Sequence, residues 1–455
     1  MSVCVGNRCG RVSAASSNCL SLVFALALSA CGGGGDGGNI AIAEGQGADP
    51  VVVDVPIAYV KRPAPVDDMG DPLVTDAREL LVFDEGTIGA DLIVRERASP
   101  TAAEINVTED ILQGMGDVRD VEASYDGERF IFAMRGPFDP NLDEDEQPTW
   151  NLWEYEIATD ALRRIITSDI QAEEGHDLAP HYLPDGRIIF SSTRQRQSFA
   201  TLLDESKPPF YALDENRNEP AFVLHVINPD GSEPRQVSFN QSHDLDPTVT
   251  SDGKVVFSRW DNAGSEGIHL YRMNPDGSEL ELLYGANSHD TGTNGAEVQF
   301  LQPREMPGGR ILTVMRPFTA DVLGGDLVEI EVANYLENTQ PPAPNAGVLS
   351  GPAQASAVIN DVRTEGSISP GGTFGAAFPL LDGTDRLFVS WSQCRLLENN
   401  QVVPCTPSRL ADPNAVAAAP AYGIWMYDLG ENTQLPIVPA EQGVVYSEVV
   451  AAQPR

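Results

Sequence analysis

Residues 243–284 read HDLDPTVTSDGKVVFSRWDNAGSEGIHLYRMNPDGSELELLY, and they form the clearest repeating unit of the chain. The order of apolar and polar residues predicts four short strands, at 246–249, 254–259, 268–274 and 280–283. Asp252-Gly253 separates the first two strands, and the run 274–277, Asn-Pro-Asp-Gly, separates the last two. Both runs are typical of tight turns, because glycine tolerates a positive φ. The stretch therefore predicts one antiparallel four-stranded sheet.

The same unit recurs along the chain. His176-Asp177 lies 67 residues before His243-Asp244, whereas the run NPDGSE at 228–233 lies only 46 residues before its copy at 274–279. The earlier copy therefore contains an insertion of 21 residues between its second and third strands. Fainter copies of the first turn occur at 125–127, 307–309 and 381–383.

A four-stranded sheet cannot bury both of its faces without neighbours, so the repeats predict an all-β fold, a β-propeller with six four-stranded blades. Five blades are expected at 117–170, 176–240, 243–285, 296–350 and 366–440. An irregular first blade is expected from strands at 57–60, 79–83, 91–95 and 104–107. Val444 to Ala451 is the expected terminal strand that closes the ring with that first blade.

The N-terminal part has the features of an export signal. Residues 1–19 contain Arg8 and Arg11 and no acidic residue, and residues 20–30, LSLVFALALSA, are an eleven-residue apolar run. This run is long enough for a signal peptide and too short for a membrane-spanning helix. We therefore expect a signal peptide at 1–30, a glycine-rich tether at 31–50 and the propeller at 51–455.

The end of the apolar run, Leu28-Ser29-Ala30-Cys31, resembles the lipobox of bacterial lipoproteins. The resemblance implies that Cys31 is acylated and anchors the chain in a lipid bilayer. Gly32 after the cysteine resembles the sorting pattern of outer-membrane lipoproteins, which implies a place in the cell envelope facing the periplasm. The alternative is an ordinary secretory signal with an incidental cysteine.

Charge and cysteine content restrict the partners and cofactors. A net charge of −38 argues against nucleic acid and anionic membrane surfaces as direct partners. Cys394 and Cys405 are expected to form a disulfide in an oxidising compartment. The chain contains no Cys-x-x-Cys-His motif, so no covalent haem is encoded.

The repeats also resemble a known family. The runs HDLAPHYLPDGRIIFSSTR and HDLDPTVTSDGKVVFSRW resemble the repeats of TolB-like (PD40, WD40-like) propellers. PIAYVKRP near the start and VVAAQPR at the end are similar to lipoproteins with a propeller like the middle domain of the hydrazine synthase alpha subunit. The resemblance implies a propeller over residues 50–455. It implies no haem ligands, because the chemistry of the synthase belongs to its haem-bearing parts.

The expected functional surface is the face with long loops. Insertions at 136–149, 195–219 and 393–421 connect second and third strands, which places them at one end of the propeller. At the same end, three His-Asp pairs precede inner strands and are expected at the channel mouth: His176-Asp177, His243-Asp244 and His289-Asp290. Imidazole and carboxylate together suit a divalent transition metal. In the alternative interpretation, the aspartates cap blade turns and the histidines fill a polar channel. His181, His225 and His269 are expected to be packing or surface residues.

A second candidate is an acidic loop with the residues Asp139, Asn141, Asp143 and Asp145. The first three match the spacing of the first ligands of a calcium loop, but Glu144 stands where the loop needs glycine and Trp150 where it needs glutamate. The alternative is a solvated acidic loop. Four arginines end second strands in corresponding places, where they form salt bridges between blades or hold an anionic ligand: Arg135, Arg194, Arg259 and Arg316.

No catalytic residue is predicted. The chain contains no Gly-x-Ser-x-Gly, no phosphate loop and no His-Glu-x-x-His. We therefore expect an exported, lipid-anchored propeller that binds an exported protein partner through its long-loop face and serves as a scaffold. The alternative is a subunit without haem in an exported redox or metalloenzyme complex.

Overall fold

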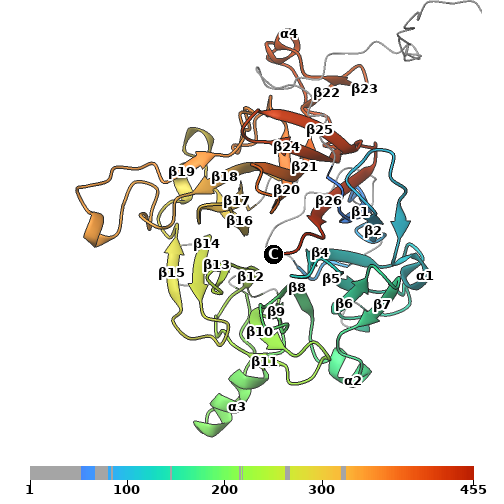
Figure 1. Ribbon diagram of the computed structural model, residues 1–455, viewed down its shortest axis with the longest axis vertical. Helices are drawn as coiled ribbons and strands as arrows, with labels where there is room; N and C mark the ends of the chain where they lie inside the picture. The colour runs from blue at the N-terminus through green and yellow to red at the C-terminus, as the bar shows by residue number, and fades with distance from the viewer. Residues whose placement is uncertain are drawn as a thin grey trace, which may run out of the picture. The chain divides into compact units, whose positions relative to one another are not determined.

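Six antiparallel sheets of four strands surround a central channel (Figure 1). The computed structural model describes residues 53–66, 80–83, 86–143, 146–214, 217, 219–261, 267–318 and 324–455. The expected signal peptide, Cys31, the tether and Asp145 lie outside the described residues. The prediction of a six-bladed β-propeller is confirmed.

The blades follow one another around the channel, and each blade runs from an inner to an outer strand. Blades 1 and 2 contain β26 (Val444–Ala451), β1 (Ile57–Pro63), β2 (Asp91–Arg95), β3 (Ile105–Asn106), and then β4 (Asp117–Ala123), β5 (Arg129–Arg135), β6 (Asn151–Glu156), β7 (Ala161–Arg164). Blades 3 and 4 contain β8 (Asp177–Tyr182), β9 (Ile188–Ser192), β10 (Val223–Ile227), β11 (Arg235–Gln236), and then β12 (Asp244–Val249), β13 (Val255–Trp260), β14 (Ile268–Met273), β15 (Glu281–Tyr284). Blades 5 and 6 contain β16 (Gln299–Glu305), β17 (Ile311–Arg316), β18 (Asp326–Ile330), β19 (Gln354–Ser356), and then β20 (Thr373–Pro379), β21 (Arg386–Ser392), β24 (Tyr422–Asp428), β25 (Thr433–Val438).

The helices are short and lie in the connections. They are α1 (Glu109–Leu112), α2 (Asp169–Ala172), α3 (Arg196–Asp204), α4 (Pro407–Leu410) and the 3-10 helices η2 (His289–Thr291), η3 (Thr293–Gly295) and η4 (Ala343–Asn345). Among the described residues, no helix has the length and the apolar content needed to cross a membrane.

The last strand of the chain closes the ring, as predicted. β26 pairs antiparallel with β1, from Ile57 opposite Ala451 to Pro63 opposite Val444. Because β26 takes the inner place, blade 1 needs only three strands from the N-terminal part. The prediction of a strand at 79–83 is therefore wrong. Its described part, residues 80–83, forms no strand. Instead, the N–H groups of Leu80 and Leu81 donate to the carboxylate of Glu219, at 3.2 and 2.9 Å.

The apolar core lies between neighbouring blades. One cluster joins Ile131 and Leu152 of blade 2 to Ile188 and Phe190 of blade 3. Each sheet therefore buries both faces against its neighbours, which is the physical reason why one blade is not stable alone.

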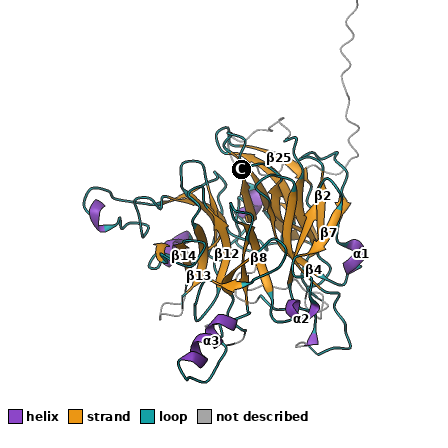
Figure 2. Cartoon of the chain, turned by 60° about the horizontal axis from the view of Figure 1, so that its bottom comes forward, coloured by secondary structure: helices purple, strands orange, loops and turns teal. Residues whose placement is uncertain are grey.

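The long insertions connect second and third strands, as expected. The insertion of blade 3 carries α3, and that of blade 6 carries a hairpin of β22 (Arg395–Glu398) and β23 (Gln401–Pro404). The predicted disulfide joins Cys394 to Cys405 at the base of this hairpin. Figure 2 shows α2 and α3 at the same end of the strands.

A β-bulge interrupts each inner strand. The register of the inner pair shifts once in every blade, and in five blades a residue with φ between 48° and 60° stands at or beside the shift: Asp120, Ala179, Asp246, Gln302 and Glu448. In blade 6 the shift lies at Gly375. The bulges bend the strands, and the residues that carry them line the channel.

Candidate functional site: the channel and the long-loop face

All six inner strands contribute to one cavity in the channel. It has a volume of about 60 Å³ and is lined by the bulges and the residues that follow them, including Asp120, Asp246, Arg304 and Glu448. A cavity of this size and polarity has room for a few water molecules. Residues 452–455 continue from β26 towards the centre of the ring, where the C-terminal end of the chain lies (Figure 1).

Three acidic side chains connect the bulges of neighbouring blades. Glu448 accepts a hydrogen bond from the N–H of Asp120, and the carboxylate of Asp120 accepts one from the N–H of Ala179 at 2.9 Å. Asp246 accepts in the same way from the N–H of Gln302, at 3.0 Å. Each carboxylate therefore ties its own blade to the backbone of the next blade.

The same carboxylates repel one another across the channel. Burial, together with the negative charge of Asp120, raises the pKa of Asp246 to about 6 and the pKa of Glu448 to about 7. The guanidinium of Arg119 lies 3.2 Å from the carboxylate of Asp120. Near neutral pH the carboxyl group of Glu448 is therefore partly protonated, whereas a carboxyl group in water is ionised.

A second layer is an ion network around Glu122. Arg304 extends from blade 5 and forms an ion pair with Glu122 of blade 2, and Arg455 forms a second. Burial alone would raise the pKa of Glu122, but the two arginines hold it far below its usual range. His181 lies 3.9 Å from the same carboxylate, and burial lowers its pKa to about 4. The network fills this part of the channel with protein groups.

Two of the three predicted His-Asp pairs have their histidines hydrogen-bonded to the backbone of a neighbouring blade. Nδ1 of His176 accepts a hydrogen bond from the N–H of Trp150 at 3.3 Å, and Nδ1 of His243 accepts one from the N–H of Phe222 at 3.1 Å. Each histidine thus joins its blade to the preceding one. Among the described residues, no group of three or more His, Cys, Asp or Glu side chains has a spacing that would hold a metal ion.

The aspartates of two pairs bind arginines instead. Asp177 lies 2.7 Å from Arg194, and Asp244 lies 2.7 Å from Arg259. Both carboxylates are fully buried. Arg194 and Arg259 therefore form salt bridges with the repeated aspartates, but each bridge lies within one blade, so the prediction of bridges between blades is wrong for these two. Asp290 of the third pair is exposed.

The third histidine has a neighbour that sequence reasoning missed. Nε2 of His289 lies 3.4 Å from Nδ1 of His269, a residue expected to be packing or surface. The two residues are 20 positions apart, one in a strand and one in the connection to the next blade. No local motif signals this contact, because it depends on how blade 4 meets blade 5.

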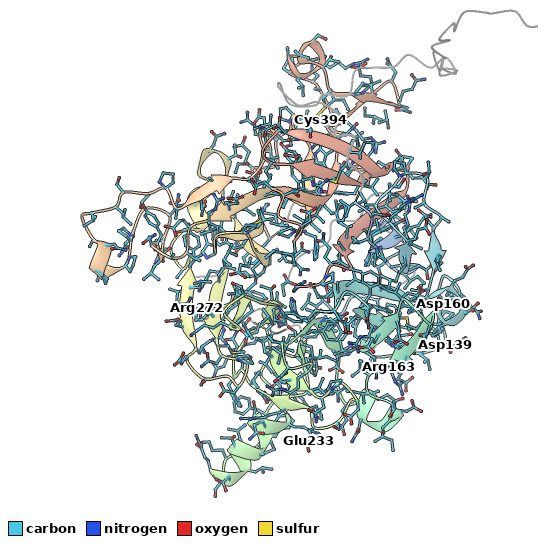
Figure 3. The ribbon with its side chains drawn as sticks, viewed as in Figure 1. Asp139, Asp160, Arg163, Glu233, Arg272 and Cys394 are labelled. Carbon is cyan, nitrogen blue, oxygen red and sulfur yellow. A yellow bond between two sulfur atoms is a disulfide. The ribbon has the colours of Figure 1, made fainter. Side chains whose placement is uncertain are left out.

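The acidic loop does not form a calcium cage from its described residues. Oδ1 of Asp139 accepts hydrogen bonds from the backbone and side-chain amides of Asn141, at 2.9 and 2.8 Å, which lowers the pKa of Asp139. Asp143 is exposed. Figure 3 shows Asp139 at the outer part of blade 2, away from the channel.

The insertion of blade 3 exposes apolar side chains. Leu203 is 61% exposed, and Phe210 and Tyr211 are each 58% exposed. Tyr211 meets Phe199 edge to face, with ring centres 4.6 Å apart. We call the segment from Phe199 to Tyr211 the α3 tip. It extends outward from blade 3 at the end of the strands where α2 also lies (Figure 2).

Gln195 fixes the base of this insertion. Its side-chain amide donates to the carbonyls of Ala212 and Ala221 at 2.9 and 3.1 Å, and its Oε1 accepts from the N–H of Ala212 at 2.8 Å. The α3 tip is therefore an apolar protrusion on an ordered base.

Comparisons with known proteins identify the fold. No protein-family model and no curated protein matches the chain. Among solved structures, hydrazine synthase from Kuenenia stuttgartiensis matches with a TM-score of 0.55 and 16% identity, over 89% of this chain and 48% of that chain. This chain therefore spans about half of that protein's length. The match confirms the propeller implied by the resemblance.

Two further structures match less well. TolB from Acinetobacter baumannii has a TM-score of 0.37 at 13% identity, over 81% of this chain and 66% of that chain. An oligogalacturonate lyase in complex with manganese has a TM-score of 0.38 at 10% identity, over 78% and 73%. At these scores the two structures carry no argument about this chain's chemistry, and identities this low describe the fold alone.

Proposed function

We propose that this chain is an exported, lipid-anchored propeller of the cell envelope that binds a protein partner through its long-loop face. The observation that carries the proposal is the exposed apolar cluster of the α3 tip. Leu203, Phe210 and Tyr211 are each more than half exposed, and all three belong to one insertion. Aromatic and aliphatic side chains in such a cluster favour burial against another protein.

The charges beside the tip indicate the chemistry of the partner. Asp204 and Glu205 are exposed next to Leu203, and Lys207 pairs with Glu205 at 2.6 Å. The whole chain has a net charge of −38. A partner with an apolar groove bordered by basic side chains would complement this tip. The negative charge of the chain disfavours partners with acidic surfaces.

The binding contribution of the tip is tested by the combined change Leu203→Ser, Phe210→Ser and Tyr211→Ser. A photo-crosslinking residue is placed at position 207 and the chain is expressed in the organism that naturally produces it. We expect one crosslinked adduct with a partner protein, and its yield is expected to fall at least tenfold in the triple variant. The loss is expected because apolar anchors provide most of the binding energy of an interface. The melting temperature is expected to change by less than about 2 °C, because exposed substitutions alter stability little.

The matched control is the pair Leu397→Ser and Val402→Ser. These residues are 42% and 47% exposed on the hairpin of blade 6, so the control removes exposed apolar side chains from another insertion. The control variant is expected to keep the adduct. An adduct of unchanged yield in the triple variant, or its equal loss in the control, contradicts binding at the α3 tip.

Export and the lipid anchor are supported by the sequence around Cys31 and by the disulfide, which is typical of oxidising compartments. Replacement of Cys31 by serine is expected to move the chain from the membrane fraction to the soluble fraction of lysed cells. It is also expected to abolish labelling by a fatty acid, since acyl chains supply the membrane affinity. Retention of Cys31→Ser in the membrane fraction without label would mean that an uncleaved N-terminal segment holds the chain there.

A further inference from the structure

Two histidine nitrogens face each other on the long-loop side, where blade 4 meets blade 5. His269 stands near the start of β14, and His289 lies in η2 just before β16. Nδ1 of His269 and Nε2 of His289 are 3.4 Å apart. On the outer side of His269, its Nε2 lies 3.6 Å from the carboxylate of Asp261, which accepts a hydrogen bond from the hydroxyl of Tyr271 at 3.0 Å.

No neutral form of the pair satisfies all of these atoms. Nδ1 of His289 lies 2.7 Å from the carbonyl oxygen of Val298, so this nitrogen carries the proton and Nε2 presents a lone pair to His269. If His269 is protonated on Nδ1, its Nε2 lone pair faces the carboxylate of Asp261. If it is protonated on Nε2, its Nδ1 lone pair faces that of His289. Nε2 of His269 is indeed buried without a hydrogen-bond partner among the described residues.

A cation between the two histidines resolves the conflict. With bonds of about 2.0–2.1 Å, two nitrogen ligands of a tetrahedral ion are roughly 3.3–3.4 Å apart, as these two nitrogens are. Asp261 then accepts the Nε2 proton of His269, and the Val298 carbonyl accepts the Nδ1 proton of His289. These are the orienting contacts that metal-bound histidines usually make.

The ring of His289 can lie in this position because residue 267 is glycine. A Cβ built at Gly267 would lie 2.4 Å from Nε2 of His289, which no real side chain tolerates. The same Cβ would lie 2.8 and 2.9 Å from Cδ2 and Cε1, so it would sit over the face of the ring. Any other residue at this position would therefore displace the imidazole and move its Nε2 away from His269.

We propose that His269 and His289 bind a divalent transition-metal ion through Nδ1 and Nε2, with Asp261 and the Val298 carbonyl orienting the two rings. The site takes ions that prefer imidazole, such as Zn²⁺ or Cu²⁺, rather than Ca²⁺ or Mg²⁺, which prefer oxygen. Two protein ligands leave further positions of the ion to water or to a ligand from solution.

The histidines also have the protonation state that a metal needs. Burial and the neighbouring His289 lower the pKa of His269 to about 4, and burial lowers the pKa of His289. Both imidazoles are therefore neutral at pH 7 and keep lone pairs for coordination. This site shares His289 with the sequence-based metal hypothesis and replaces His176 and His243 by His269. It stands independently of the proposed partner binding.

The experiment is a titration of the purified full-length chain, prepared without chelator or affinity metal, with Zn²⁺ by calorimetry and with Co²⁺ by visible absorption. One ion per chain is expected, with a rise in melting temperature on addition of Zn²⁺. His269→Gln and His289→Gln are each expected to weaken binding at least a hundredfold. Asp261→Asn is expected to weaken it roughly 10–100-fold through the orientation of His269.

Glycine variants test the site without replacing either histidine. Gly267→Ala is expected to abolish binding, whereas Gly430→Ala, whose added Cβ would meet Asp428 at an ordinary 3.4 Å, is expected to leave it unchanged. Circular dichroism shows which variants fold. Zn²⁺ binding that survives in folded His269→Gln and His289→Gln overturns the proposal. So does the absence of binding by the wild-type chain at 100 µM Zn²⁺, which would leave a shared proton as the occupant.

Discussion

Replacement of Asp244 by alanine is expected to lower the free energy of unfolding by about 3–5 kcal/mol, because it leaves a buried guanidinium without its counter-ion. Asp244 is 0% exposed, and its carboxylate accepts hydrogen bonds from Nε and Nη2 of Arg259 at 2.7 and 2.9 Å. Ser238 donates a third hydrogen bond at 2.6 Å. Urea unfolding of the purified chain, followed by tryptophan fluorescence, measures the change.

The complete comparison is a double-mutant cycle. Arg259→Ala is expected to cost a similar amount, and the double variant is expected to cost less than the sum of the two, because no unpaired charge remains. The matched control is Arg187→Ala, which breaks an exposed pair with Asp185, 42% and 55% exposed, and is expected to cost less than about 1 kcal/mol. A cost below 1 kcal/mol for Asp244→Ala would show that Arg259 finds another partner or water.

Glu448→Gln is expected to stabilise the propeller by about 3 kcal/mol at pH 8 and by less than about 1 kcal/mol at pH 5. Glutamine keeps an oxygen that accepts the N–H of Asp120, so the variant removes the charge and retains the hydrogen bond. The magnitude follows from the rise of the pKa of Glu448 from 4.5 to about 7, at about 1.4 kcal/mol for each unit.

The sign follows from proton linkage. Burial first and the charge of Asp120 second raise the pKa of Glu448 in the folded chain, so the folded state holds a proton that the unfolded state releases. The stabilisation by this proton is complete below about pH 4.5 and is lost as the pH rises through 7. The other charges near Glu448 are Arg62 on β1 and Arg119 on β4, whereas β20 carries no charged residue.

The measurement is the free energy of unfolding of both chains between pH 5 and pH 8. Comparing each variant with the wild type cancels the opposite effect of the buried histidines, whose lowered pKa values weaken the fold below pH 6.5. Glu128→Gln removes an exposed charge and serves as the control, with a difference from wild type that is expected to stay flat. A flat difference for Glu448→Gln as well would mean that Glu448 is already ionised at pH 5.

The sequence predicts the blades correctly and the segment at 79–83 incorrectly. The repeated Asp-Gly turns and strand patterns predict blades because turns and alternation are local properties. The same reasoning placed a strand at 79–83, where the described residues instead bind Glu219 of the blade 3 insertion. That segment is apolar enough for a strand, but β26 completes the four strands of blade 1, and the segment instead contacts a residue 139 positions away.

For the candidate site residues, the sequence indicates the positions and the tertiary structure decides the partners. His176-Asp177 and His243-Asp244 repeat in the sequence, and the repeat correctly indicates equivalent positions. Their partners come from strand register, since Asp244 lies opposite Arg259 in the ladder between β12 and β13. Two bulges, one in β26 and one in β4, place Glu448 and Asp120 in the channel, and both residues have a positive φ.

By itself, the sequence of this chain determined the number of blades, the closing strand at Val444–Ala451 and the pairing of Cys394 with Cys405. Only the tertiary structure decided that three bulge carboxylates share the channel, that Arg304 reaches across it to Glu122, and that His269 meets His289. The reason is physical. Strand period, turns and cysteines act over a few residues, whereas these contacts form only when six blades close into a ring and bring distant residues within a few ångströms.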